Sequence, residues 1–242
     1  MDSEHSPKNR LLNAFPPTLI EKLAPDLIPI SLQRGDRLHE PGDEIKMLYF
    51  PINCVLSITI VMQDGATAET GLVGNREVLG VNAFMGGRET TQTTYSVQAP
   101  GTAMKIDARI LLEEFNQNKE LRDVMLRYTQ AFIAQISQNA ACNSLHELDR
   151  RLARWLLEVH DRVEGDHLEL TQEFMADMLG VRRAGVTQTA QKLQEGNLIH
   201  YSRGHVDILS RSGLEASTCE CFATLKGEYD RLLGAVRAGS LS

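Results

Sequence analysis

Two adjacent arginines, Arg182 and Arg183, are the residues whose type and position point most directly to chemistry. Their surroundings predict that they lie in the first turn of a helix, where the helix dipole disfavours cations by roughly 0.3–1 kcal/mol each. Arginines at such a tip can contact phosphates and pair with guanine edges of DNA. Two solvated surface arginines are the simpler alternative, but the pattern around them favours DNA contact.

The stretch around these arginines, residues 170–199, is typical of a helix-turn-helix. Apolar residues at helical spacing give its first helix a buried side, and Ala176 is small where a second helix must cross closely. Gly180 suits a left-handed exit from the first helix, and Val186 continues the apolar side in the second. We therefore expect the arginines to project from the start of the second helix.

A short hairpin is predicted directly after the helix-turn-helix. Residues 198–201 and 205–209 have the pattern of two strands, and residues 202–204 have turn chemistry. A hairpin in this place is the wing of a winged helix, and its tip would present Arg203 and His205 to phosphates beside the groove. An exposed basic turn without a ligand is the alternative.

The formal net charge of −7 does not suit a protein that coats nucleic acid by charge alone. Between residues 182 and 205, however, the fixed charges are four cations against the single carboxylate of Glu195. Screening limits charge effects to about 8–10 Å, so a local basic patch can act by itself. The chain of 242 residues, with 42% hydrophobic and 24% charged residues, is otherwise ordinary for one or two folded domains.

Membrane and catalytic functions find no support in the sequence. No apolar run approaches the ~20 residues of a membrane span, and residues 1–10 contain no apolar signal core. We therefore expect a cytoplasmic protein with no membrane partner. The histidines form no HExxH pattern, and no GxSxG or phosphate-loop motif occurs. We expect no catalytic residues, no enzyme activity and no cofactor.

The four cysteines are Cys54, Cys142, Cys219 and Cys221. No CxxC pair occurs, and the spacing matches neither a zinc finger nor a clustered iron–sulfur set. In a cytoplasmic chain we expect free thiols. The Cys219-Glu220-Cys221 segment hints weakly at redox or metal chemistry, but two ordinary cysteines are the favoured interpretation, and we expect no metal site.

The hydrophobic period changes near residue 107. Residues 10–23 predict a short helix interrupted at Phe-Pro-Pro, residues 15–17, and residues 27–106 then follow a period of two. Turn signals such as Pro41-Gly42-Asp43 recur between the alternating runs. Many short strands at this spacing favour an antiparallel sandwich or closed roll, with an interior large enough for a small ligand.

A short helix is predicted over residues 108–115, and a long one over residues 118–145 carries two apolar stripes. One stripe has the spacing of a coiled-coil seam, and the other lies on a second face. Two stripes suggest one contact with the chain's own roll and one with a partner helix, so we expect a homodimer; a core helix within a monomer is the alternative. The seam residues are Leu121, Met125, Tyr128 and Phe132, and those of the second face are Val124, Ile133 and Ile136.

Near and beyond Ile136 the seam becomes polar, with Gln135, Gln138, Asn139 and Asn143. Polar seam positions fix register at a cost in stability, so we expect this end of the helix to be held weakly and the following domain to swing. A helix with a clean apolar face starts near residue 146 and opens that domain. Residues 214–236 again have a helical pattern, whose packing partner the sequence does not identify.

This order of parts resembles the Crp/Fnr family of bacterial transcription regulators. The resemblance covers residues 11–212, and its most specific parts are residues 170–199 and the segment LQRGDRLHEPGDEIKMLYF, which is similar to the opening strands of cyclic-nucleotide-binding domains. It implies an α+β fold: an N-terminal antiparallel β-roll (double-stranded β-helix), a long dimerisation helix and a C-terminal winged helix-turn-helix. The expected domains are a sensor roll (1–116), the dimerisation helix (117–145), the DNA-binding domain (146–215) and a helical tail (216–242).

The resemblance implies a dimeric sensor that binds a pseudo-palindromic operator in double-stranded DNA and contacts RNA polymerase. Arg183 falls where these proteins commonly place a base-reading arginine, and Thr171 and Gln172 open the first helix where phosphates are usually held. Arginine prefers guanine and glutamine prefers adenine, with ~1–3 kcal/mol of discrimination per good pair. The candidate DNA-binding residues are Thr171, Gln172, Arg182, Arg183, Thr187, Gln188, Lys192, Arg203 and His205.

The sensor half departs from family members that bind cyclic nucleotides. Those members have a glycine followed by glutamate for the ribose, and then an arginine and a small residue for the cyclic phosphate. Here no glutamate follows Gly80, and the arginine position falls on Gln92 or Thr93. Burying a phosphate charge without a bidentate cation is costly, so we expect no tight binding of cyclic AMP. The candidate effector pocket comprises Gly80, Asn82, Arg88, Gln92 and Thr93.

Other effectors of the family also lack support in the sequence. There is no N-terminal cysteine cluster for an iron–sulfur centre and no Cys/His set for haem in the roll. The effector stays open: none, a non-cyclic small molecule, or a redox signal through Cys54 or Cys142. The alternative function is a small-molecule or redox sensor whose winged domain serves protein–protein interaction instead of DNA reading.

Overall fold

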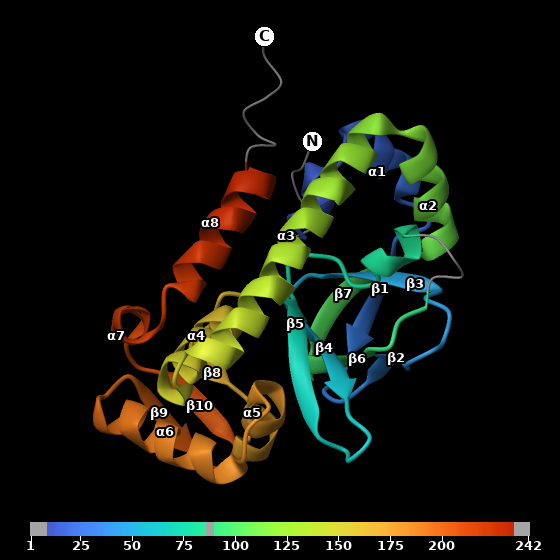
Figure 1. Cartoon of the computed structure of the whole chain (residues 1–242). Helices are drawn as coiled ribbons and strands as arrows, with labels where there is room; N and C mark the ends of the chain where they lie inside the picture. The colour runs from blue at the N-terminus through green and yellow to red at the C-terminus, as the bar shows by residue number, and fades with distance from the viewer. Residues whose placement is uncertain (1–8, 86–89, 235–242) are drawn as a thin grey trace.

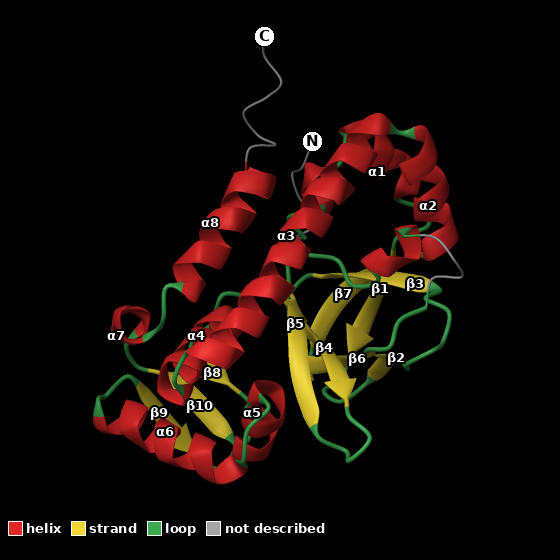
Figure 2. Ribbon diagram, viewed as in Figure 1, coloured by secondary structure: helices red, strands yellow, loops and turns green. Residues whose placement is uncertain are grey.

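The computed structural model describes residues 9–85 and 90–234. A β-roll lies at one side, a winged domain lies below it, and one long helix, α3, runs from beside the roll down to the winged domain (Figure 1). The expected α+β architecture of roll, long helix and C-terminal winged helix-turn-helix is confirmed (Figure 2). Within the described residues no helix is long and apolar enough to cross a membrane.

The N-terminal segment is a short helix interrupted at prolines, as its sequence predicts. Its 3₁₀ turn η2 (Leu12–Ala14) is followed by α1 (Pro17–Leu23), which starts with proline where the missing N–H costs nothing. Leu19 and Leu23 of α1 are buried in the roll core, so this segment closes one end of the roll.

The roll consists of two antiparallel sheets that share one apolar core. Leu48, Phe50 and Leu56 are fully buried in that core. In the chain, the 3₁₀ turn η3 (Val81–Phe84) lies between the strand that ends at Val73 and the strand that starts at Thr94. One sheet has the order β1 (Ile28–Leu32), β7 (Gly101–Asp107), β3 (Met47–Pro51), and the other has the order β2 (Arg37–His39), β6 (Thr94–Ala99), β4 (Val55–Val61), β5 (Thr67–Val73).

Two helices follow the roll, and a side chain at the N-cap position starts each of them. The carboxylate of Asp107 accepts a hydrogen bond at 2.8 Å from the backbone N–H of Arg109 and starts α2 (Ala108–Gln117). Asn118 Oδ1 accepts at 3.0 Å from the N–H of Leu121 and starts α3 (Lys119–Leu145). The cap at Asn118 therefore separates the short helix from the long one.

The structure corrects the predicted faces of α3. All four predicted seam residues are buried in the chain's own roll core, where the Tyr128 hydroxyl donates to the carbonyl of Val78 at 2.7 Å. Val124, assigned to the second face, is buried in the same core. The apolar residues that α3 leaves exposed over its middle are Leu126, Ile133 and Ile136. A seam with coiled-coil spacing can equally pack on a sheet, so spacing alone could not assign the faces.

The winged domain has its own core, in which Trp155, Leu156 and Val186 are buried. Its wing is a three-stranded antiparallel sheet, and the short strand β8 that completes it was not predicted. Its elements are α4 (Leu148–His160), β8 (His167–Leu168), α5 (Gln172–Leu179), α6 (Arg183–Glu195), β9 (Ile199–Ser202) and β10 (His205–Ile208).

The C-terminal segment forms two helices, α7 (Arg211–Ser217) and α8 (Cys221–Leu233). The expected boundary between residues 215 and 216 falls inside α7. Helix α8 runs beside α3 (Figure 1). Its Tyr229 is part of the roll core, and the Arg76 guanidinium lies 4.9 Å from the Tyr229 ring centroid. The tail thus packs against both α3 and the roll.

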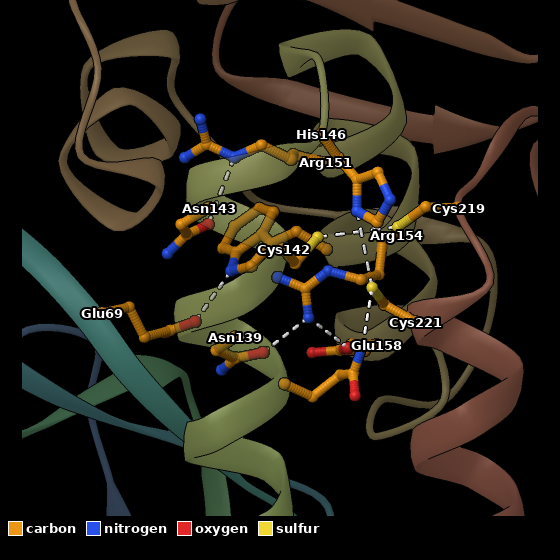
Figure 3. Close-up of polar contacts among 12 residues, drawn as sticks. Glu69, Asn139, Cys142, Asn143, His146, Arg151, Arg154, Glu158, Cys219 and Cys221 are labelled. Atoms are coloured by element: carbon orange, nitrogen blue, oxygen red, sulfur yellow. Dashed lines mark hydrogen bonds and ion pairs between the residues drawn. The ribbon is translucent and has the colours of Figure 1, made fainter.

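The polar end of α3 is firmly bonded, contrary to the expectation of a weakly held end. Asn139 Oδ1 accepts from Arg154 Nη1 at 2.7 Å, and its amide donates to the carbonyl of Thr70 at 3.2 Å. Arg151 Nε donates to Asn143 Oδ1 at 3.2 Å (Figure 3). The amides face partners on α4 and the roll, so in this structure they hold the winged domain in place.

Candidate DNA-binding surface and sensor cleft

The turn between α5 and α6 is built by local chemistry. The Thr171 hydroxyl accepts at 3.1 Å from the N–H of Phe174, which caps the start of α5. Gly180 ends α5 with a φ of +63°, a left-handed conformation that glycine adopts without strain. Ala176 and Val186 are buried where the two helices cross, so the opposite side of α6 is left exposed.

The start of α6 exposes both predicted arginines. Arg182 occupies the N-cap position without a side-chain cap, and the first turn contains no acidic residue. Within the described residues the exposed Arg182 side chain has no hydrogen bond or ion pair, and the Arg183 side chain is 66% exposed. Arg183 Nη1 lies 3.7 Å from an exposed carboxylate oxygen of Glu173, and such surface pairs contribute little. Both guanidinium groups are therefore available to an incoming anion.

The rest of the predicted face divides into free and bonded residues. The side chains of Gln188 and Lys192 are exposed and have no hydrogen-bond or ion-pair partner among residues 9–85 and 90–234. The Thr187 hydroxyl lies 2.7 Å from Gln172 Oε1 and 3.1 Å from the carbonyl of Arg183. This contact joins α5 to α6, so in the free chain Thr187 and Gln172 orient the two helices.

The wing places its two predicted residues differently. Arg203 and Gly204 form a two-residue loop with φ angles of +46° and +89°, as a type I′ hairpin turn requires. Arg203 is exposed, and Gly204 lies beside Thr171, since a Cβ added to Gly204 would be 3.4 Å from Thr171 Cγ2. His205 is not at the tip: it is half-buried in β10, its ring stacks 4.9 Å from that of His167, and its Nδ1 has no described partner.

A cleft of about 350 Å³ opens on the roll between β2, β3 and β6. Its charged lining residues are Asp43, Glu44 and Lys46. The buried ring of His39 also lines the cleft, with its centroid 4.9 Å from that of Tyr95. Burial lowers the pKa of His39 below its ordinary value of 6.5, so the ring is neutral at pH 7. The described charges of the cleft are therefore two carboxylates and one ammonium.

The predicted effector residues do not converge on this cleft. Gly80 has a φ of +99° and shapes a turn against the carbonyl of Met47, and Gln92 is exposed. The Thr93 hydroxyl bonds that of Thr91 at 2.9 Å. Asn82 contacts the cleft wall, since its Oδ1 accepts from the Tyr95 hydroxyl at 3.4 Å. Arg88 lies outside the described residues.

Buried polar and ionic contacts that the sequence did not predict join the roll to the winged domain. Arg162, just after α4, pairs with Glu77 at 2.7 Å, and both side chains are at most 1% exposed. Glu69 on β5, labelled in Figure 3, accepts from the Trp155 indole at 2.8 Å. It also accepts from the Ser57 hydroxyl at 2.5 Å. Burial raises the pKa of Glu69 to about 7. The only sign of these contacts in the sequence was the group of arginines in and just after the helix that became α4.

Known proteins share both the helix-turn-helix and the fold. Residues 150–217 match the family of Crp-like helix-turn-helix domains. The chain is 20% identical over 205 residues to the global nitrogen regulator of Synechococcus elongatus. This match covers 80% of this chain and 92% of that protein. A putative Crp/Fnr transcriptional regulator from Eubacterium rectale superimposes with a TM-score of 0.67 at 19% identity, over 85% of this chain and 96% of that one. FixK2 from Bradyrhizobium japonicum gives a TM-score of 0.69 at 12% identity, over 80% and 98%.

The fold and the helix-turn-helix together are those of the class of solved transcription regulators to which this chain is similar. Within that class, the resemblance to the Crp/Fnr family that the sequence indicated is confirmed. The related proteins are described as regulators and not as enzymes.

Proposed function

We propose that this chain is a sequence-specific DNA-binding transcription regulator that acts in the cytoplasm as a homodimer on a pseudo-palindromic operator. The observation that carries the proposal is the start of α6, where Arg182 and Arg183 stand exposed on a helix end with no side-chain cap. Uncapped N–H groups and the positive end of the helix dipole form a ready site for phosphate. Arginine adds a planar fork that matches guanine.

The remaining residues support this assignment by their position. Arg183 would read a guanine and Gln188 an adenine, because these pairings are the geometrically favoured ones in the major groove. Thr171 and Arg203 lie on neighbouring segments beside α6, where they would contact the DNA backbone together with Lys192. Thr187 and Gln172 are already bonded to each other, so their part is to orient the helices.

The exposed stripe of α3 supports the homodimer. Leu126, Ile133 and Ile136 are 54%, 56% and 37% exposed, and they follow the seven- and three-residue spacing of a coiled-coil seam. The same stripe on a second copy would cover it in a two-fold arrangement. A two-fold dimer presents two copies of α6, and half-sites of DNA lie about 34 Å apart when they are one turn apart.

The roll would then be a sensor that does not take cyclic AMP. A cyclic phosphate needs a bidentate cation, and within the described lining of the cleft the only fixed cation is Lys46, opposed by Asp43 and Glu44. A neutral or cationic small molecule fits this lining better. Contact with RNA polymerase is part of the proposal because regulators of this class act at promoters.

The test is binding of the full chain to its own upstream DNA, measured by fluorescence anisotropy between 50 and 200 mM salt. With six to ten phosphate contacts, affinity falls about 10³–10⁵-fold across this range. Arg183→Ala should weaken specific binding by about 1–3 kcal/mol and leave binding to shuffled DNA nearly unchanged. Arg37→Ala, which removes a 61% exposed arginine of the roll, is the matched control.

Two results would overturn the proposal at different points. Unchanged specific binding by Arg183→Ala would show that Arg183 is not the base reader. A chain that binds no duplex of its upstream region at low salt would favour the alternative function, in which the winged domain contacts protein.

A further inference from the structure

Four potential metal ligands converge where α3, α4 and α8 meet (Figure 3). Cys142 and His146 lie one helical turn apart at the end of α3, and Cys219 and Cys221 flank the start of α8. All four ligand atoms lie within 4.8 Å of one another. The three thiols are nearly or fully buried, and the imidazole is 18% exposed.

The spacing of these atoms is close to that of a tetrahedral zinc site. With Zn–S near 2.3 Å and Zn–N near 2.0–2.1 Å, the edges of the tetrahedron are about 3.8 Å between sulfurs and about 3.6 Å between sulfur and nitrogen. The Cys142 and Cys219 sulfurs are 3.6 Å apart, and Cys221 Sγ is 3.5 Å from His146 Nδ1. A cation could therefore be seated by small side-chain movements.

We propose that Cys142, His146, Cys219 and Cys221 bind one Zn²⁺ ion as a structural Cys₃His site. Three thiolates and one imidazole form a soft ligand set that selects zinc over calcium or magnesium. The four protein ligands fill all four positions, which is the arrangement of a structural site and not of a catalytic one.

The surroundings of the four ligands are those of a metal site. His146 Nε2 lies 3.4 Å from Glu220 Oε1, so the ring nitrogen that faces away from the sulfurs has a carboxylate partner. Ligating histidines nearly always have such a partner, which fixes Nδ1 as the ligand. The Gln138 amide donates to Cys221 Sγ at 3.0 Å. The Gln138 amide and the His146 imidazole thus both contact the Cys221 sulfur. A thiol that served only as a small apolar residue would need no such polar neighbours.

A nearby arginine, which also pairs with Glu158, offsets part of the charge of the proposed site. Zinc with three thiolates carries a net charge of −1, which is costly to bury alone. Arg154 is 3% exposed, interacts electrostatically with Cys142 and Cys219, and has an Nε without a hydrogen-bond partner among the described residues. Its Nη1 already bonds Asn139 and Glu158, so the arginine is held beside the sulfurs.

The linear sequence could not reveal this site, because the ligand pairs are separated by the whole winged domain. The expectation of no metal rested on spacing along the chain, and the proposal replaces it. The site would join the end of α3, the segment before α4 and the start of α8. If the proposed function holds, zinc would thus fix the position of the DNA-binding domain relative to the long helix.

The experiment uses the full chain, purified without a histidine tag, stripped with a chelator and refilled with ZnCl₂ alone. Mass spectrometry of the metal content should give about one zinc per chain, and X-ray absorption should show three sulfurs near 2.3 Å and one nitrogen near 2.0 Å. Cobalt in place of zinc should give the intense visible bands of tetrahedral thiolate coordination. These measurements need no variant.

Variants locate the ligands. Cys219→Ser and His146→Ala should each lower zinc affinity more than tenfold, because they remove a ligand. Cys54→Ser is the matched control, because Cys54 is also a buried free thiol but lies in the roll core. It should retain the full zinc content.

The proposed site would be overturned by less than about a tenth of an equivalent of zinc per chain after refilling, or by a coordination shell without sulfur. It would also be overturned if Cys54→Ser lost as much zinc as the ligand variants, or if freshly isolated protein contained a Cys142–Cys219 disulfide. Binding of upstream DNA is measured on the same sample. Zinc without DNA binding would refute the proposed function alone, and DNA binding without zinc would refute the metal site alone.

Discussion

Glu69 shows how a single buried residue joins the two halves of the molecule. It belongs to β5 of the roll, yet its carboxyl group bonds the indole of Trp155 in α4. Desolvation raises its pKa from 4.5 to about 7, while the donors Ser57 and Trp155 and the charge of Arg154 oppose that rise and Glu158 adds to it. At neutral pH this residue is therefore close to its titration midpoint.

This position gives a stability that depends on pH. The folded chain holds the proton of Glu69 between pH about 4.5 and 7 while the unfolded chain has released it, so stability falls as pH rises through this window and levels off above it. The full effect is on the order of 3 kcal/mol. Glu69→Gln should flatten this part of the profile of unfolding free energy, measured by urea denaturation from pH 5 to 8.

The control for this prediction is Glu40→Gln, which changes a 48% exposed carboxylate of the roll and should keep the wild-type slope. A Glu69→Gln profile parallel to that of the wild type would show that Glu69 does not titrate in this range.

At the scale of elements, α3 explains both what sequence patterns predict and where they stop. Its bounds follow from local signals, such as the cap at Asn118. Its faces do not, because Tyr128 and Phe132 repeat with the spacing of a coiled coil although they pack on the roll. Leu126, which is also a large hydrophobic residue, is exposed. Which stripe meets the roll depends on tertiary packing, and no local pattern encodes it.

The exposed stripe of α3 leads to a prediction on assembly. Ile133→Lys places a charge in the middle of the stripe, where burial in a dimer would leave it unpaired and cost several kcal/mol. Light scattering after size exclusion should show the wild type as a dimer and Ile133→Lys as a monomer at micromolar concentration. Gln117→Lys, an exposed change at the end of α2, should leave the dimer intact. A monomeric wild type, or a dimeric Ile133→Lys variant, would contradict the proposed interface.

At the scale of the whole molecule, the winged domain is docked on its own roll. Val55 and Leu72 of the roll belong to the core of the winged domain, and the buried Arg162–Glu77 pair bridges the two. Removing one partner of such a pair costs about 3–5 kcal/mol, because it leaves the other charge buried and unpaired. The docked arrangement leaves Arg182 and Arg183 uncovered.

The sequence predicted the order of parts well because each part has a local signature. Gly180 requires a left-handed turn, and Arg203-Gly204 closes a hairpin, so the helix-turn-helix and the wing could be placed within a residue or two. The buried ion pairs, the cleft and the cysteine–histidine cluster join segments far apart in the chain. Their residues have no shared period, and only the fold brings them together.

The central claim is that two copies of α6 read DNA through their N-terminal ends. The most direct measurement is methylation interference on the chain's upstream DNA, which reports the guanines whose N7 atoms the bound protein contacts. The account predicts two symmetric groups of interfering guanines one helical turn apart, about 10–10.5 base pairs, and their loss in Arg183→Ala. A single group, an irregular spacing, or an unchanged pattern in Arg183→Ala would contradict it.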